Sequence, residues 1–108
     1  MGAIKKQIRH AFRTAVFERD SYACKVCGND RFSFDTFDAH HISNRNEIIN
    51  GGYVIENGIT ICSDCHLKAE MTMNSGAYYP GYSPDDLYKL IGSSKETAIA
   101  ASKLLKCD

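Results

Sequence analysis

The chain has 108 residues, of which 44% are hydrophobic and 24% are charged, and its formal net charge at pH 7 is zero. This length is enough for one domain with a modest core, and the balanced charge argues against a generally basic nucleic-acid binder. No apolar run reaches the roughly 18 residues of a membrane span, and the first residues, MGAIKKQIRHAF, lack the pattern of a secretory signal. We therefore expect a single domain over residues 1–108, located in the cytoplasm and without a membrane partner.

Acidic and basic residues are nevertheless unevenly distributed along the chain. Residues 1–31 contain seven basic and three acidic side chains, whereas residues 32–66 contain one basic and five acidic side chains. This polarity predicts a phosphate-binding end and a cation-binding middle.

Residues 4–19 carry apolar side chains near helical spacing, with basic side chains on the other side, and predict an amphipathic helix. Its basic stripe either contacts backbone phosphates or forms an ordinary solvated face, and it consists of Lys5, Lys6, Arg9 and Arg13. His10 is expected to be a surface residue of the same helix.

A turn and two strands are expected next. The segment DSYACKVCGND, residues 20–30, predicts a turn like a zinc knuckle, because Gly28 and Asn29 tolerate a left-handed backbone. Residues 32–42, FSFDTFDAHHI, alternate in part and are rich in aromatic residues, which predicts a strand. Residues 43–62 contain a Gly-Gly loop and a candidate return strand, so the two strands predict a β-hairpin with a long connection.

The remainder of the chain is expected to be helical apart from one loop. A helix should begin near Ser63, and residues 73–84, rich in Gly, Pro and Tyr, should form the loop. The loop tyrosines either stack on bases or pack the loop onto the core, and packing is the favoured interpretation for Tyr78, Tyr79 and Tyr82.

Two further helices are predicted at the C-terminal end of the chain. Ser83, Pro84 and two acidic residues form a strong helix start. Ser93 and Glu96 have the spacing of a capping box and predict the start of the last helix.

Four of the five cysteines form two C-x-x-C pairs, and four thiolates are a ligand set of closed, tetrahedral zinc sites. In a reducing compartment such pairs are typical of metal ligands rather than disulfides. The alternative is four ordinary buried cysteines. We expect structural Zn2+ bound by Cys24, Cys27, Cys62 and Cys65, whereas Cys107 is unpaired and read as incidental.

Two histidines, His40 and His41, are adjacent in the first predicted strand. Neighbouring strand residues point to opposite faces, so the two imidazoles cannot easily bind the same ion and should have separate tasks. Asp38 lies on the same strand face as His40, and a solvated carboxylate is its favoured interpretation.

The motifs DAHHI and ENGITICSDCH, within the frame of the two C-x-x-C pairs, resemble the HNH nuclease family and its ββα-metal motif. The resemblance extends over about residues 13–70, and the three motif residues would be His41, Asn57 and His66. It implies a small α+β domain of the ββα-metal type with a four-cysteine zinc site, a core over about residues 13–72 and flanking helices. The implied activity is that of a metal-dependent DNA endonuclease or nickase.

The resemblance also implies a role for each residue of the site. His40 and His66 would hold a divalent ion that stabilises the phosphate and the leaving 3′ oxygen, and His41 would be the general base that activates water. A neutral imidazole suits this task because its unperturbed pKa is about 6.5. Asn57 would hydrogen-bond across the hairpin loop and orient the base, and this interpretation is favoured over a simple Asn-Gly turn.

One position departs from the family pattern, because Glu70 stands where many members have a further histidine. Its carboxylate, one helical turn after His66, either binds or orients at the ion site or is a solvated surface charge. With fewer nitrogen ligands, a hard catalytic ion such as Mg2+ or Mn2+ is favoured, and Ni2+ or Zn2+ are the alternatives.

The expected macromolecular partner is DNA, and Arg45, in the loop after the histidine pair, is a further candidate for contact with it. The resemblance is to compact proteins of phages and bacteria. It therefore leaves open a homodimer or a larger phage or restriction complex, in the host cytoplasm for a phage protein. The alternative function is a non-catalytic, zinc-stabilised module that binds nucleic acid or protein.

Overall fold

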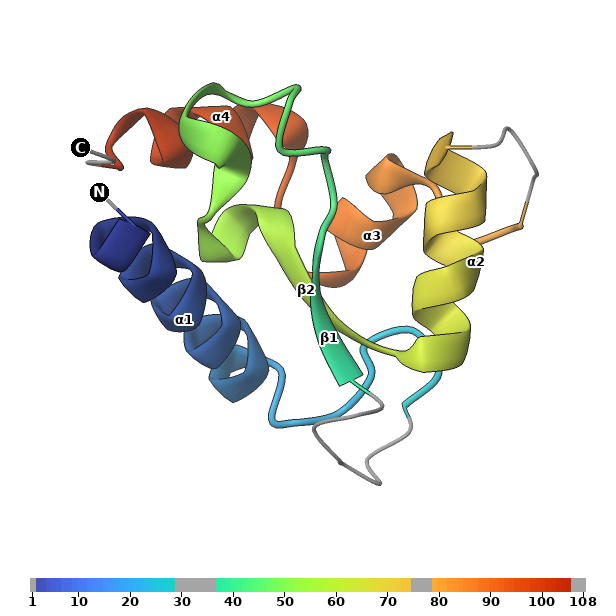
Figure 1. Cartoon of the computed structure of the whole chain (residues 1–108). Coiled ribbons are helices and arrows are strands. Elements are labelled where there is room, and N and C mark those ends of the chain that lie inside the picture. Colours follow the sequence, from blue (N-terminus) through green and yellow to red (C-terminus); the bar gives the residue numbers. More distant parts are fainter. Residues whose placement is uncertain (1, 29–36, 75–78, 106–108) are drawn as a thin grey trace.

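The computed structural model describes residues 2–28, 37–74 and 79–105, and Figure 1 shows how they are arranged. Helix α1 (Gly2–Arg19) is followed by strand β1 (Phe37–His41), strand β2 (Gly58–Cys62) and helix α2 (Ser63–Asn74). Helices α3 (Pro84–Leu90) and α4 (Lys95–Lys103) complete the described chain. The α+β class and the order of the elements are those that the sequence predicts.

The two strands form an antiparallel hairpin between α1 and α2 (Figure 1). Phe37 pairs with Cys62 at one end and His41 pairs with Gly58 at the other. The long connection contains two short 3-10 helices, η1 (Ile49–Gly52) and η2 (Ile55–Asn57). The predicted hairpin is therefore confirmed, although residues 32–36 of the expected first strand lie outside the described residues.

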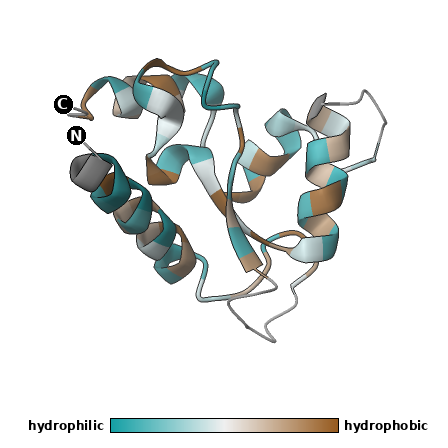
Figure 2. Cartoon of the chain, viewed as in Figure 1, coloured by the Kyte–Doolittle hydropathy of each residue, from teal (hydrophilic) through white to brown (hydrophobic). Residues whose placement is uncertain are grey.

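Both α1 and α2 pack on the hairpin, and every residue of β2 is buried between its neighbours. Figure 2 shows hydrophilic and apolar residues interspersed along α1, as an amphipathic helix on a core requires. The core is one cluster drawn from α1, the strands, the connection and the last three helices. Its largest members are Phe17, Phe37, Ile42, Ile48, Ile59, Ile61, Leu87 and Tyr88.

A buried carboxylate fixes the end of α1 to β2. Asp20 accepts the backbone N–H of Thr60 at 2.8 Å and pairs with Arg19, whose Nε donates to Asp20 Oδ1 at 2.8 Å. Arg19 Nη2 also donates to the Gly58 carbonyl oxygen at 2.6 Å. Because a buried charge must be paired and hydrogen-bonded, these contacts hold α1 in a defined position beside the strand that pairs with both histidines.

Helix α4 lies against the connection between the strands (Figure 1). Ser83 caps α3, as predicted, by accepting the Asp86 N–H at 3.2 Å. The predicted cap of α4 is wrong by one residue, because Ser94 accepts the Thr97 N–H at 3.1 Å. Ser93 instead donates its hydroxyl to the Glu56 carbonyl oxygen at 2.8 Å. A tertiary contact thus occupies the side chain that the sequence assigned to capping.

The loop before α3 contacts α2 through two of its tyrosines, and Tyr82 packs against the core as predicted. The Tyr79 hydroxyl donates to Met71 Sδ at 3.8 Å, and the Tyr82 hydroxyl donates to Cys65 Sγ at 3.3 Å. His10 is exposed, as expected. Tyr78 and Cys107 lie outside the described residues. None of the helices in the described part of the chain is both long and apolar enough to cross a membrane.

Candidate active site

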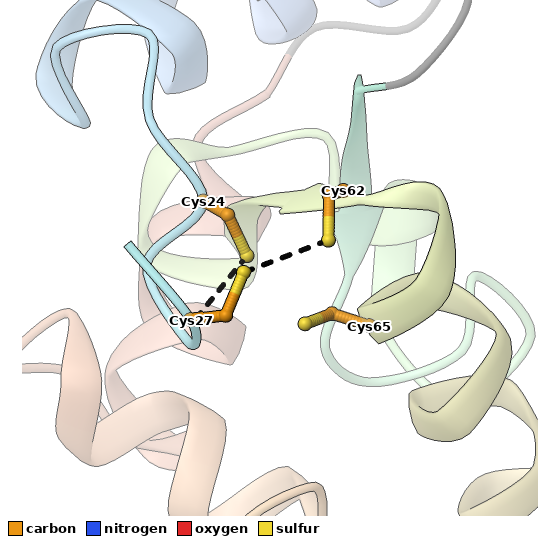
Figure 3. Close-up of side chains that lie close together, drawn as sticks. All are labelled: Cys24, Cys27, Cys62 and Cys65. Carbon is orange, nitrogen blue, oxygen red and sulfur yellow. Dashed lines mark hydrogen bonds between the residues drawn. The ribbon is translucent and has the colours of Figure 1, made fainter. Parts of the chain in front are cut away.

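The four paired cysteines come together at the junction of the hairpin and α2 (Figure 3). Cys24 and Cys27 lie in the turn after α1, Cys62 ends β2, and Cys65 lies in the first turn of α2. Their sulfur atoms are all within 4.8 Å of one another, and those of Cys27 and Cys62 are 3.7 Å apart. Zinc–sulfur bonds of about 2.3 Å in a tetrahedron separate the sulfurs by about 3.8 Å. The cluster therefore fits a structural zinc ion.

Local backbone geometry shapes the first half of this cluster. Gly28 has a positive φ of 77°, as predicted, and its N–H donates to the Cys24 carbonyl oxygen at 2.9 Å. Burial raises the pKa of the Cys24 thiol, but the backbone N–H groups of Cys27, Cys62 and Val26 together outweigh it and lower the pKa to about 7. A pKa near neutrality favours the thiolate, which is the form that binds metal.

The two adjacent histidines of β1 point to different parts of the molecule, as predicted. The His40 ring lies 5.1 Å from that of His66 on α2, centre to centre. The His41 ring stacks on Phe12 of α1 at 4.6 Å and meets the edge of Tyr53, from the connection, at 4.7 Å. One imidazole therefore belongs to a polar group at α2, and the other is enclosed by aromatic rings at α1.

The group at α2 has the composition of a cation site. Ligand atoms of His40, His66 and Glu70 lie within 4.8 Å of one another. His66 is also in contact with two carboxylates, because its Nδ1 lies 2.9 Å from Asp38 Oδ2 and its Nε2 lies 2.8 Å from Glu70 Oε1. Nε2 of His40 is buried and has no hydrogen-bond partner among the described residues. A buried nitrogen of this kind, beside a second imidazole and carboxylates, fits a divalent cation.

The contacts bear on the expectations for two acidic residues of this group. Asp38 is about half exposed, as expected of a solvated carboxylate, but its carboxylate also contacts His66 and lies 3.7 Å from Arg13 Nη1. Glu70 is likewise not an isolated surface charge, since it pairs with His66 one helical turn away. The signal for Asp38 was available in the sequence, because residues two apart on a strand share a face with each other.

Both hairpin histidines are neutral at pH 7. Burial, with smaller contributions from His66 and His41, lowers the pKa of His40 from 6.5 to about 3. Burial and the positive charge of Arg45 lower the pKa of His41 from 6.5 to about 4. A neutral imidazole keeps a lone pair, so each ring is able to bind a cation or accept a proton.

Asn57 is completely buried at the end of η2, and its side chain makes four hydrogen bonds. Its Oδ1 accepts the Ser43 N–H at 2.9 Å and the Tyr88 hydroxyl at 2.8 Å. Its Nδ2 donates to the carbonyl oxygens of Ser43 at 3.2 Å and Gly52 at 3.1 Å. The side chain thus spans the hairpin connection, and it reaches the chain two residues after His41.

The polar group at α2 opens into a cavity of about 390 Å³, which His41 also lines. Two cavities of about 260 and 490 Å³ adjoin it, and Arg45 lines all three. Arg9 lines the two outer cavities, Lys5 only the larger one and Arg13 only the smaller one. The predicted basic residues, except Lys6, are therefore gathered on the walls of a hollow that ends at the histidines.

The basic residues differ in how they are engaged. Arg45 donates to the Tyr53 hydroxyl at 2.9 Å, and Arg13 lies over the Phe17 ring at 4.7 Å as well as near Asp38. Lys5, Lys6 and Arg9 are exposed and form no ion pair with any residue that the structure describes. Charges that the protein leaves uncompensated remain available to an anionic partner.

Phe12 and Tyr53 are site residues that the sequence did not identify. In the sequence, Phe12 is one of several apolar positions of an amphipathic helix, and Tyr53 follows a Gly-Gly loop. Neither pattern indicates contact with a histidine far along the chain. Only the packing of α1 and the connection around β1 brings both rings to His41.

Comparison with known proteins gives one family match. Residues 24–71 match the family described as HNH endonuclease, whose members are generally phosphodiester hydrolases. No curated protein and no solved structure matched the chain. The matched residues include the four cysteines, both histidines of β1, Asn57 and His66. The chain therefore contains an HNH endonuclease domain, and this membership implies nuclease activity.

Proposed function

We propose that the protein is a metal-dependent DNA endonuclease, in which His41 is the general base and His40 and His66 hold a divalent ion. The observation that supports this most strongly is the separation of the two adjacent histidines. His40 lies with His66 and Glu70 in a group suited to a cation. His41 lines the same cavity but packs on the aromatic ring of Phe12. Hydrolysis of a phosphodiester needs a bound cation and a proton acceptor side by side.

His41 activates the attacking water in this proposal. Its depressed pKa, about 4, keeps the ring neutral, and Phe12 and Tyr53 restrict its orientation. Nε2 of His41 is buried, so we assign proton acceptance to Nδ1. Asn57 acts at a distance from the proton transfer, because it holds the chain that follows His41 rather than the ring itself.

The catalytic ion would be held by Nε2 of His40 and by His66 and Glu70, with Asp38 orienting His66. When bound, the ion supplies polarisation of the phosphate and stabilisation of the leaving 3′ oxygen, which gives 5′-phosphate and 3′-hydroxyl ends. Because Glu70 stands in place of a further imidazole, the site is better suited to Mg2+ or Mn2+ than an all-histidine site would be, with Ni2+ or Zn2+ as alternatives. The four-cysteine site has no open position for chemistry and stabilises the fold.

DNA would lie along the hollow formed by the three cavities. Lys5, Arg9, Arg13 and Arg45 line it, and Lys6 is exposed on the same helix. These side chains suit contacts with backbone phosphates, which give affinity without reading sequence. Because the described residues of one chain supply one such site, we expect a single-strand nick per binding event. A double-strand break would require a second copy or a larger complex.

A plasmid-nicking assay tests the proposal. Supercoiled DNA is incubated with the zinc-loaded protein and Mg2+, Mn2+ or Ni2+, and wild type is compared with His41→Ala. Loss of a general base should reduce the rate by about 10²–10⁴-fold. His10→Ala is the matched control, because His10 is an exposed histidine on α1 that lines none of the three cavities.

Zinc content and thermal unfolding show whether each variant is folded. Nicking by the wild type and by His10→Ala, lost in a folded His41→Ala protein, would support the assignment. Equal nicking by all three would remove His41 from its role. Binding to DNA without cleavage, for every ion, would favour the non-catalytic zinc-stabilised module instead.

A further inference from the structure

Three hydroxyl groups from the chain beyond the family match reach into the connection between β1 and β2. The Tyr88 hydroxyl, from α3, donates to Asn57 Oδ1 at 2.8 Å and lies 2.7 Å from Ser43 Oγ. Ser93, just before α4, donates to the Glu56 carbonyl oxygen at 2.8 Å. The matched family segment ends at residue 71, so none of these hydroxyls belongs to it.

Ser102 of α4 supplies the third hydroxyl, and it is completely buried. Its Oγ donates to the Ile49 carbonyl oxygen at 2.6 Å and accepts the Gly52 N–H at 3.2 Å. There is no room for a side chain at Gly52, because a Cβ there would lie 2.6 Å from Asn57 Nδ2. The connection is therefore closed on itself through Asn57 and held from outside by α3 and α4.

Tyr88 completes the hydrogen bonding of the motif asparagine. Asn57 has two donor hydrogens and two acceptor lone pairs, and the Tyr88 hydroxyl occupies the one lone pair that the connection itself does not use. Tyr88 is 3% exposed, so water does not readily replace its hydroxyl. Removal of the hydroxyl would leave a buried acceptor lone pair of Asn57 without its donor and the buried Ser43 hydroxyl without its acceptor.

The residues positioned by this connection lie against the proposed general base. Tyr53 meets the His41 ring at 4.7 Å, and its hydroxyl accepts from Arg45 at 2.9 Å. Arg45 also lowers the pKa of His41 and lines all three cavities. A shift of the connection would therefore move both the wall of the hollow and the surroundings of His41.

We propose that Tyr88 is a positioning residue, through which the α3–α4 segment holds the connection so that Tyr53 and Arg45 lie correctly against His41. This inference rests on the proposed function for its catalytic consequence. The functional unit would then be larger than the HNH segment of residues 24–71. A small displacement of the connection is enough to affect the cleavage rate, since misplacement of a catalytic group by about 1 Å can cost about 100-fold in rate.

Tyr88→Phe tests the inference, because it removes the hydroxyl and keeps the ring in the core. The matched control is Tyr79→Phe, because the Tyr79 hydroxyl contacts Met71 of α2, away from the connection. Three measurements are compared: the single-turnover cleavage rate at saturating DNA, the affinity for DNA, and the NMR signal of the His41 ring. Should Tyr88→Phe fail to fold, Ser102→Ala probes the same connection at Gly52 and Ile49.

We expect Tyr88→Phe to lower the single-turnover rate by about tenfold, to leave DNA affinity within about twofold, and to shift the His41 signal, whereas Tyr79→Phe does none of these. A lower melting temperature with an unchanged rate and an unchanged His41 signal would assign Tyr88 a purely structural role and overturn the inference. If the wild type cleaves no DNA, the proposed function fails, and the His41 signal alone decides whether Tyr88 positions its surroundings.

Discussion

Gly58 lies directly opposite His41 in the two-stranded sheet, and the ring of Phe12 occupies the space that a side chain at Gly58 would need. Paired residues of neighbouring strands point to the same face of the sheet, so Phe12 can stack on His41 only because its partner has no side chain. The Asn-Gly step of the motif therefore has two separate functions in this chain. Asn57 holds the connection, and Gly58 leaves room for α1 to pack on His41, the proposed general base.

Substitution of Gly58 by Ala should destabilise the protein and disturb His41. A Cβ at this position would lie 2.5 Å from Val16 Cγ2 and 2.7 Å from Phe12 Cε1, both in a packed core. Overpacking of this kind costs about 1–3 kcal/mol, which denaturant unfolding would measure. We also expect a changed NMR signal for the His41 ring, because Phe12 must move. Wild-type stability in Gly58→Ala would contradict the packing of α1 on β2.

Removal of the two metals should have different consequences. A strong chelator that strips the cysteine-bound zinc should unfold the domain, because structural zinc contributes roughly 10 kcal/mol in zinc-finger peptides. Omission of only the exchangeable divalent ion should abolish cleavage while the melting curve stays close to that of the complete protein. Cys27→Ser should reproduce the first effect, and Cys107→Ser, outside the two C-x-x-C pairs, is its control. Identical melting with and without zinc would argue against a structural metal.

Asp38→Asn should weaken the binding of the proposed catalytic ion without unfolding the protein. Asp38 Oδ2 lies 2.9 Å from Nδ1 of His66. Mutation of a carboxylate that orients a ligating histidine typically lowers metal affinity by about 10–100-fold. The half-saturating concentration of Mn2+ in the nicking assay should rise by a similar factor. Glu96→Gln, an exposed acid on α4, serves as the comparison. Unchanged Mn2+ dependence in Asp38→Asn would show that His66 needs no such support.

Local spacing carried most of what could be predicted from the sequence, whereas tertiary contacts decided the rest. The cysteine pairs and His40–His41 are recognisable because ligand spacing and strand alternation act within a few residues. The contact of Phe12 with His41 depends on how α1 docks, and no local pattern encodes it. The cap of α4 shows the same limit. The sequence offers two adjacent serines, and a tertiary contact with the Glu56 carbonyl oxygen engages Ser93, while Ser94 caps the helix.

The pKa of His41 should be measurably depressed in the zinc-loaded protein without the catalytic ion. Burial and Arg45 lower it from 6.5 to about 4, so an NMR titration should find the ring neutral at pH 5.5. Because the unfolded chain takes up this proton first, the stability contribution is complete above pH 6.5 and is lost as the pH falls towards 4. Arg45→Gln should raise the pKa. A His41 pKa near 6.5 would mean that the ring is solvated.

Neutralising a basic residue that lines the hollow should change the salt dependence of DNA binding more than the rate of cleavage. Arg9 lines both outer cavities and pairs with no residue of the described chain. If it contacts one phosphate, Arg9→Gln should reduce the slope of log K against log salt by about 1, since each phosphate contact releases about one counterion. The single-turnover rate at saturating DNA should stay within about twofold, because phosphate contacts of this kind position the DNA and take no part in the reaction.

Lys103→Gln is the control, because Lys103 is an exposed lysine at the end of α4 that lines none of the three cavities, and it should leave the slope unchanged. Equal slopes for Arg9→Gln and Lys103→Gln would place the DNA backbone away from this hollow.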